Sequence, residues 1–254
     1  MKKNESYTDQ ARRQFISKVV AGAGLAVAPG VVLHQVAQAK PADQPASNKV
    51  RWGILINTNK CATGCTDCVS ACQEEHAWGA ASENEAHSSK LQKAQWIRKV
   101  KVTDKQTGYV MSLPMMCQHC KNPPCVDVCP TGASMKRADG IVLVDRHICI
   151  GCRYCMLACP YKARSFIHEE LHDQSVNAPR GMGTVEACNM CVKRVDNDGI
   201  PACVEACNQA EHNAMLFGDL KDPNSDISIE LKQHGGEQIR EDLGLDTGVR
   251  YQGI

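Results

Sequence analysis

Apolar stretches in this chain are short, and polar residues or glycine-containing turns separate them. This pattern is typical of short strands joined by turns. It predicts strands in four segments, at residues 50–57, 96–102, 109–116 and 214–217. The second and third segments flank a Thr107–Gly108 turn, so they are expected to form a hairpin.

Two further segments predict hairpins because each contains an Asp-Gly pair, which favours a tight turn. One runs from residues 134–137 to residues 141–145 across Asp139–Gly140. The other is a hairpin-like excursion at residues 192–202 around Asp198–Gly199. The second excursion is expected to fill a long gap between two cysteines.

Helices and irregular segments are expected between and after these strands. Ser225 or Asp226 is a suitable N-cap, and the residues that follow predict a short helix to about Lys232. Residues 73–94 are polar and predict a surface loop with room for a helix. The polar segment 238–254 predicts an irregular tail that wraps the body or a partner.

Sixteen cysteines dominate the chemistry of the chain, and they fall into four groups of four with none left over. The iron atoms of a cubane cluster take one cysteine sulfur each, so sixteen thiolates predict four 4Fe–4S clusters. A protein with four such centres is expected to transfer electrons. In chain order the groups are Cys61, Cys65, Cys68, Cys72; Cys117, Cys120, Cys125, Cys129; Cys149, Cys152, Cys155, Cys159; and Cys188, Cys191, Cys203, Cys207.

The spacing within the groups is similar to that of bacterial ferredoxins. The third group has the run C-x2-C-x2-C-x3-C-P, which ends at Pro160. The second group has four residues in its middle gap and is also followed by a proline, Pro130. The first group opens with a gap of three residues, and the fourth has a middle gap of eleven. In these two groups Gln73 and Asn208 stand in place of the proline.

The last gap is three residues long in every group. In two-cluster ferredoxins the fourth cysteine of each group binds the other cluster, so the groups are expected to work in pairs. Sequence alone permits two arrangements. One pairs the first group with the second and the third with the fourth, and the other nests the second and third groups inside the first and fourth.

Disulfides and structural zinc are the two competing uses of so many cysteines. Small secreted domains are often disulfide scaffolds, but this chain is long enough for a core, and its C-x2-C pairs recur in a ferredoxin register. Zinc sites use C-x2-C pairs separated by longer spacers, not four cysteines within eleven residues. Neither use is expected here.

The N-terminal residues predict export. Arg12–Arg13 opens a twin-arginine pattern, a mild apolar stretch follows at residues 19–33, and Ala37–Gln38–Ala39 offers small residues for cleavage. Residues 1–39 are therefore expected to be a twin-arginine signal peptide and residues 40–49 a linker. The alternative is an uncleaved membrane anchor.

Twin-arginine export carries folded proteins, so clusters assembled in the cytoplasm would cross the membrane intact. The mature chain is expected to be periplasmic, on the outer face of the cytoplasmic membrane. No segment after residue 39 is long and apolar enough to span a bilayer, so membrane association is expected only through partners. The net charge of +1 gives no basic footprint for nucleic acid.

Three motifs resemble the four-cluster ferredoxin-like electron-transfer subunits of membrane oxidoreductases. This family contains subunits of dimethyl sulfoxide reductase, polysulfide reductase and formate-dependent nitrite reductase. The motifs are CQHCKNPPCVDVCPTGA at residues 117–133, PACVEAC at 201–207 and FGDLKDPNS at 217–225. The segments CRYCMLACPY at 152–161 and GVRY at 248–251 are most similar to the periplasmic subunit of the sulfite-reductase-associated membrane complex (DsrO type).

The resemblance implies an α+β fold of duplicated bacterial-ferredoxin-like units, with short helices, hairpins and long loops around four clusters in a line. It implies an outer unit at residues 50–113 and 169–230, an inner unit at 114–168 and a tail at 231–254. It also implies the nested arrangement of ligands. The four sets are then Cys61, Cys65, Cys68 and Cys207; Cys188, Cys191, Cys203 and Cys72; Cys117, Cys120, Cys125 and Cys159; and Cys149, Cys152, Cys155 and Cys129.

By the same resemblance, the chain is expected to relay single electrons in a respiratory or sulfur-metabolism complex, with no substrate site of its own. Its expected partners are a quinone-linked integral membrane subunit and a cytochrome or other redox subunit. The alternative is the iron–sulfur subunit of a nitrite reductase or of a molybdenum enzyme. A redox sensor would need an output domain, and none is evident in the sequence.

Some residues near the groups have weaker expectations. His119 lies between two cysteines and is expected to pack or face solvent, with a hydrogen bond to sulfur as the alternative. Lys121, Arg153, Lys162 and Arg164 are candidates for offsetting the negative clusters. Trp52, Trp78 and Trp96 are expected to be core or interface anchors.

Overall fold

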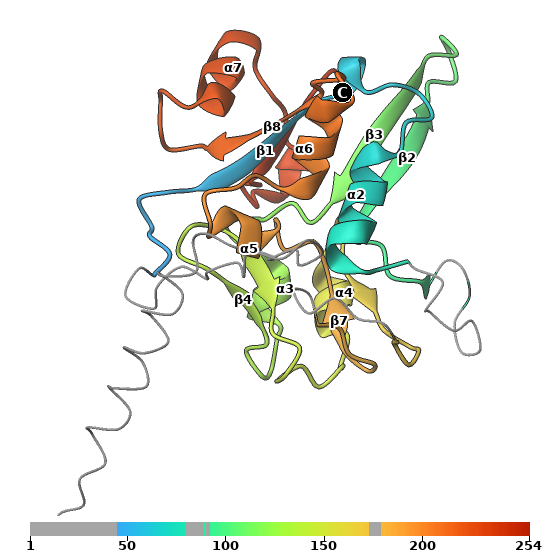
Figure 1. Ribbon diagram of the computed structural model, residues 1–254, viewed down its shortest axis with the longest axis vertical. Helices are drawn as coiled ribbons and strands as arrows, with labels where there is room; N and C mark the ends of the chain where they lie inside the picture. The colour runs from blue at the N-terminus through green and yellow to red at the C-terminus, as the bar shows by residue number, and fades with distance from the viewer. Residues whose placement is uncertain (1–44, 80–88, 90–91, 173–178) are drawn as a thin grey trace, which may run out of the picture. The chain divides into compact units, whose positions relative to one another are not determined.

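The computed structural model describes residues 45–79, 89, 92–172 and 179–254 (Figure 1). The expected signal segment 1–39, the first part of the linker and part of the 73–94 loop lie outside the described residues. By their contacts, the described residues belong to one unit.

The largest sheet of the described residues has three strands in the order β8-β1-β9. β1 (Trp52–Asn57) pairs antiparallel with β8 (Met215–Asp219) and parallel with β9 (Val249–Gln252). The side chains of Ile54, Leu55 and Ile56 are all buried, so both faces of β1 are covered. The strands expected at residues 50–57 and 214–217 are thus confirmed to within two residues.

β9 corrects the expectation of an irregular tail at residues 238–254. Val249 and Tyr251 are fully buried, and Ile54 lies opposite Val249 in the register. A run of four residues is too short to give a recognisable alternation, and the partner strand lies almost 200 residues away in sequence. The strand therefore forms through tertiary packing, not through a local signal.

Three hairpins complete the strand content of the described residues. β2 (Ile97–Thr103) pairs with β3 (Val110–Met116), as expected, and Gly108 has the positive φ of 71° that its turn requires. β4 (Ser134–Lys136) pairs with β5 (Val142–Val144), also as expected. The third pair, β6 (Ser165–Phe166) with β7 (Val185–Glu186), was not predicted.

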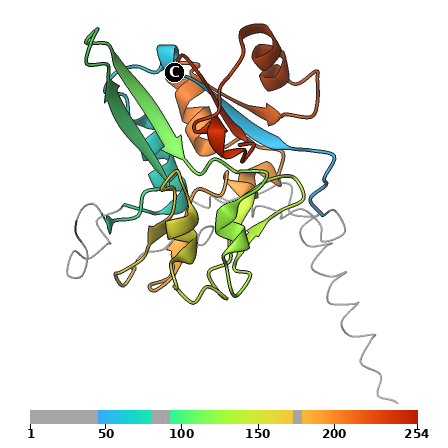
Figure 2. The ribbon, with the colours of Figure 1, turned by 180° about the vertical axis from the view of Figure 1, so that it is seen from behind.

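Short helices carry or follow most of the cysteine groups. They are α2 (Asp67–His76), α3 (Pro124–Asp127), α4 (Tyr154–Ala158), α5 (Val192–Val195) and α6 (Ala202–Gln209). α2 packs against α6, and α3 packs against α4. Figure 2 shows α2 also lying along the β2–β3 hairpin.

α5 corrects the hairpin-like excursion expected at residues 192–202. A helix begins directly after Cys191, because the amides of Arg194 and Val195 both donate hydrogen bonds to the carbonyl of Cys191. Asp198 takes a positive φ of 57°, and the amide of Gly199 returns to the carbonyl of Arg194 at 2.8 Å. The Asp-Gly pair therefore ends a helix here; it does not join two strands.

α7 (Asp226–His234) follows the expected N-cap, because the Ser225 side chain accepts a hydrogen bond from the amide of Ser228 at 3.3 Å. The helix packs on β8 and β1 and ends at a glycine, Gly235, with a positive φ. Two 3-10 turns, η1 (Thr58–Lys60) and η3 (Glu241–Leu243), complete the helical elements of the described ranges.

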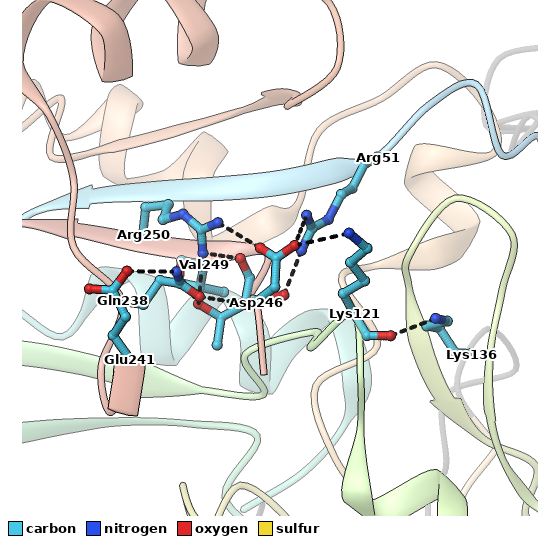
Figure 3. Close-up of polar contacts among 9 residues, drawn as sticks. Arg51, Lys121, Lys136, Gln238, Glu241, Asp246, Val249 and Arg250 are labelled. Carbon is cyan, nitrogen blue, oxygen red and sulfur yellow. Dashed lines mark hydrogen bonds and ion pairs between the residues drawn. The ribbon is translucent and has the colours of Figure 1, made fainter. Parts of the chain in front are cut away.

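Asp246 ties the C-terminal segment to two distant parts of the chain (Figure 3). Its carboxylate accepts hydrogen bonds from Arg51 Nη1 at 2.9 Å and from Arg250 Nη2 at 3.0 Å, and Lys121 Nζ lies 3.5 Å away. The amide of Lys121 donates to the carbonyls of Leu245 and Asp246. The C-terminal segment therefore holds the loop of the second cysteine group in place.

A buried ion pair stabilises the approach to the fourth cysteine group. Arg180 Nε and Nη2 donate to the two carboxylate oxygens of Glu186 at 3.0 and 2.8 Å, and Nη1 donates to the carbonyl of Ala77. Both charged side chains are almost wholly shielded from solvent. Two parallel hydrogen bonds fix the orientation of the two side chains. Losing either partner would be unfavourable, because it would leave a buried charge unpaired.

We predict that Asp246→Asn destabilises the folded chain by about 1 kcal/mol at pH 7, after allowance for solvent screening. Burial opposes ionisation, but hydrogen bonds from Arg51 and Arg250 outweigh it and lower the pKa of Asp246 to about 2. A lowered pKa contributes stability above the unfolded value of about 4 that is lost as the pH falls towards 2.

The difference in stability between the wild type and Asp246→Asn should therefore stay constant from pH 8 to pH 5. Urea-induced unfolding rates, followed by tryptophan fluorescence, measure this difference, and about a fivefold faster rate is expected. Asp242→Asn, which removes an exposed pair with Arg240, is the matched control and should have little effect. Equal effects of the two substitutions would contradict the role of Asp246.

Candidate functional site

All sixteen cysteines are free thiols, and none of them forms a disulfide. The structure brings them together in four sets of four. Cys61, Cys65, Cys68 and Cys207 line one cavity, here named site I, and Cys117, Cys120, Cys125 and Cys159 line another, site III.

The other eight thiols form two further sets by proximity. Cys72 interacts electrostatically with Cys191, and Cys203 with both Cys72 and Cys191; with Cys188 these make site II. Cys155 interacts with Cys149 and Cys129. These three thiols and Cys152, which lies between Cys149 and Cys155 in the sequence, are here named site IV. These four sets are the ones that the nested arrangement requires. If the first group were paired with the second, Cys72 would belong to a site of the second group and would not share a site with Cys188.

Helix geometry explains why the last gap of the first and fourth groups is three residues. Residues four apart lie on one face of a helix, one turn from each other, so two such cysteines face two neighbouring sites. Cys68 and Cys72 on α2 serve sites I and II, and Cys203 and Cys207 on α6 serve sites II and I. The packing of α2 on α6 thus builds two sites from two pairs of thiols. At sites III and IV the helices α3 and α4 also pack together, but Cys129 and Cys159 lie just after them and not on them.

A left-handed residue precedes the second cysteine of every group. These residues are Gly64, His119, Gly151 and Met190, with φ between 44° and 84°. This conformation coils the loop so that a backbone amide faces inward; the amide of Met190 lies 3.4 Å from the sulfur of Cys188. Two of the four residues are not glycine, so packing must hold them there against the steric cost of left-handed backbone.

The four sites form a row. Cys72 of site II interacts electrostatically with Cys68 of site I, and Cys188 of site II with Cys117 of site III. Cys125 of site III in turn interacts with Cys155 of site IV. Every thiol of sites II and III is buried, whereas Cys61 and Cys65 are partly exposed at one end and Cys152 is exposed at the other.

Burial makes these thiols poor acids unless a positive partner is present. Desolvation raises the pKa of Cys68 and Cys120 to about 12 and that of Cys191 to about 11. Converging buried sulfurs suit a positively charged metal core, which supplies the charge that water cannot. The donor set of each site therefore fits a cubane iron–sulfur cluster.

Two side chains of the α2 region lie within hydrogen-bonding distance of sulfur at site II. Trp78 Nε1 donates to the sulfur of Cys72 at 3.3 Å, and His76 Nε2 lies 3.2 Å from the sulfur of Cys191. Burial, with help from Arg146 and Arg194, lowers the pKa of His76 to about 4, so the imidazole is neutral at pH 7. A neutral ring with its proton on Nε2 can donate to a thiolate.

Sequence reasoning missed His76 and assigned Trp78 only to the core or an interface. The ring of His76 is itself held in place, since it stacks on Trp96 with centroids 4.4 Å apart. One signal was present in the sequence, because His76 follows Cys72 by one helical turn and so shares its face. Cys191, its partner, is more than 100 residues away and could not be found from spacing.

The histidine and the basic residues singled out near the cysteine groups differ in whether they are buried and whether they reach sulfur. His119 packs: it is 1% exposed, and its Nδ1 accepts from the amide of Val142 at 3.0 Å. Among the four basic candidates, Arg164 alone is buried and reaches sulfur directly. Lys121 and Lys162 are exposed, and Arg153 lies over the ring of Phe166.

Comparison with known proteins identifies two matching family models, both described as 4Fe-4S dicluster domains. They match residues 108–220 and residues 60–133. The sixteen cysteines of two dicluster domains account for four 4Fe–4S clusters. The α+β arrangement of short helices and strands agrees with this ferredoxin-like fold.

Curated relatives match nearly the whole chain. The Hdr-like menaquinol oxidoreductase iron-sulfur subunit 1 of Archaeoglobus fulgidus is 37% identical, over 95% of this chain and 97% of its own length. A tetrathionate reductase subunit of Salmonella typhimurium is 34% identical, over 97% and 89%. Protein NrfC of Escherichia coli K12 is 36% identical, over 88% and 86%.

Within the described part of the chain, no helix has the length and apolar character needed to cross a membrane. The longest helix there, α2, has ten residues. A span requires about 20 apolar residues.

We predict that Trp78→Phe lowers the midpoint potential of one cluster by up to about 60 mV, a tenfold change in the reduction equilibrium. The variant keeps the aromatic volume but removes the N–H group that stabilises the more negative, reduced form through Cys72. A redox titration followed by electron paramagnetic resonance resolves the centres. Trp52→Phe is the control, since Trp52 stacks on Phe217, and a shift of all four centres or of none would refute the role of Trp78.

Proposed function

The chain belongs to the four-cluster ferredoxin-like family of iron–sulfur electron-transfer subunits, and we propose that it relays single electrons along sites I to IV within a periplasmic, membrane-associated oxidoreductase complex. The observation that carries this proposal is the row of four thiol sets, buried in the middle and reaching the surface at both ends. A relay needs this arrangement, because electrons must enter and leave while the inner centres stay away from water.

The sixteen cysteines are proposed as the iron ligands, in the four sets that geometry brings together. Iron–sulfur clusters bound there supply one-electron redox chemistry at potentials that the protein adjusts. The chain's own residues position the sulfurs, exclude solvent and donate hydrogen bonds. Met116 and Met190, both almost fully buried, contribute apolar shielding in the core around these sets.

Substrate chemistry is proposed to belong to another polypeptide of the complex. One large hollow in the described region, between α2 and α6, is lined by Glu75, Glu205 and Arg194 among others. Arg194 donates to both of these carboxylates, at 2.9 and 2.6 Å, so the groups support packing of the two helices.

The surface at site IV suits a protein partner. Ile150, Tyr154 and Leu157 surround the exposed Cys152 in sequence and are 67%, 58% and 75% exposed. Exposed apolar side chains in one short segment are typical of an interaction surface. We propose that a redox subunit docks there and exchanges electrons with site IV.

A quinone-linked integral membrane subunit is the proposed partner on the membrane side, with a cytochrome or other redox subunit completing the complex. The similarity to an iron–sulfur subunit of a menaquinol oxidoreductase supports this assignment. The twin-arginine pattern at Arg12–Arg13 supports export in the folded state. A protein of the DsrO type in sulfur metabolism is the specific form that we favour.

The alternative function is the iron–sulfur subunit of a nitrite reductase or molybdenum-enzyme complex. The similarity to NrfC, at 36% identity, favours it. In both functions this chain does the same work, and the two differ only in the partner that supplies or consumes the electrons.

We predict that the full chain, affinity-tagged after Ile254 in its native host, co-purifies from solubilised membranes with a quinol-oxidising membrane subunit. Addition of a reduced menaquinone analogue should then reduce the clusters in the complex but not in the isolated chain.

The pair Ile150→Glu and Leu157→Glu should weaken recovery of a partner, whereas Ile229→Glu, exposed on α7, should not. Recovery of a molybdopterin subunit without a membrane subunit would favour the alternative function.

Fractionation of the same cells tests the location. The tagged chain should be released with the periplasm or remain with the membrane, and Arg12→Lys with Arg13→Lys should retain it in the cytoplasm. A wild-type chain found only in the cytoplasm would contradict the proposed export.

A further inference from the structure

Arg164 is an arginine buried among sulfur atoms. Only 6% of the residue is exposed, and its Nη2 donates to the sulfur of Cys125, a member of site III, at 3.1 Å. The residue lies five positions after Cys159, which belongs to the same site. Arg164 therefore lies against site III.

The same guanidinium also faces site IV. Its charge interacts with Cys155 of site IV as well as with Cys125 and Cys117 of site III. Its Nη1 is buried and has no hydrogen-bond partner among the described residues. One side chain thus lies between two neighbouring sites, bonded to a sulfur of one and interacting with a sulfur of the other.

No carboxylate balances this charge among the residues that the structure describes. Two other arginines differ in this respect: Arg180 pairs with Glu186, and Arg137 pairs with Asp139 and Asp196. Burying an unpaired charge costs several kcal/mol, so the compensating negative charge must come from the sulfur sites themselves. A guanidinium suits this position, because its planar fork can donate in two directions at once.

We propose that Arg164 is a shared positioning residue that raises the reduction potentials of the clusters at sites III and IV together. This inference rests on the proposed function, since it requires clusters at both sites. Reduction adds one electron, and hence one negative charge, to a cluster. A fixed positive charge and N–H donors nearby stabilise that reduced form more than the oxidised form.

The effect should be confined to one half of the row, because the guanidinium of Arg164 interacts with thiols of sites III and IV. Arg153 offers a matched comparison, because it precedes α4 in the same region but is exposed and lies over the Phe166 ring at 3.9 Å. Water screens an exposed charge, so Arg153 should have little influence on the potentials.

The test compares full-length wild type, Arg164→Met, Arg164→Lys and Arg153→Met, each prepared without oxygen. Iron and acid-labile sulfide are measured first. Redox titrations followed by electron paramagnetic resonance then give the midpoint potential of each centre. Arg164→Met should disfavour reduction of two centres by at least tenfold each, equal to about 59 mV for one electron. The other two centres should be unchanged, and Arg153→Met should resemble wild type.

Arg164→Lys keeps the charge but not the fork, so it should restore part of the potential at one or both centres. A shift in only one centre or in none, or an equal shift of all four, would overturn the shared role. Loss of the clusters in both Arg164 variants would also overturn it, by assigning the residue to assembly. Absence of clusters in the wild type would instead refute the proposed function, so the two failures are distinguishable.

Discussion

The structure depends on the bonding of buried cysteine sulfur to a positively charged metal core. Most of the sixteen thiols are buried, and desolvation raises the pKa of two of them, Cys68 and Cys120, to about 12. Left alone, such thiols would be protonated and would contribute little more than apolar packing. With iron bound, they become the cross-links of an interior that has few aromatic side chains to fill it.

The rest of the fold positions these sulfurs. Paired helices present two cysteines one turn apart, and left-handed residues in the loops coil the backbone around each set. The C-terminal strand and Asp246 then hold the second cysteine loop against the central sheet. The side chains of Trp78, His76 and Arg164 each place a nitrogen within hydrogen-bonding distance of a cysteine sulfur.

Local signals made part of this structure predictable. The β2–β3 and β4–β5 hairpins and the α7 cap follow from residues close in sequence. Cysteine spacing gave the four groups and, with the family resemblance, their nested sets. β9 and β6–β7 were not predicted because they are short and pair with distant residues. The roles of His76 and Trp78 were missed for a similar reason, since a sulfur acceptor is identified only once the fold brings it near.

The most direct test is the iron and acid-labile sulfide content of the full chain after strictly anaerobic purification. The account predicts about sixteen atoms of each per chain, four for every cluster. Zinc in place of iron, or iron without sulfide, would contradict it, because the four sulfur sets would then not hold the clusters on which electron relay depends.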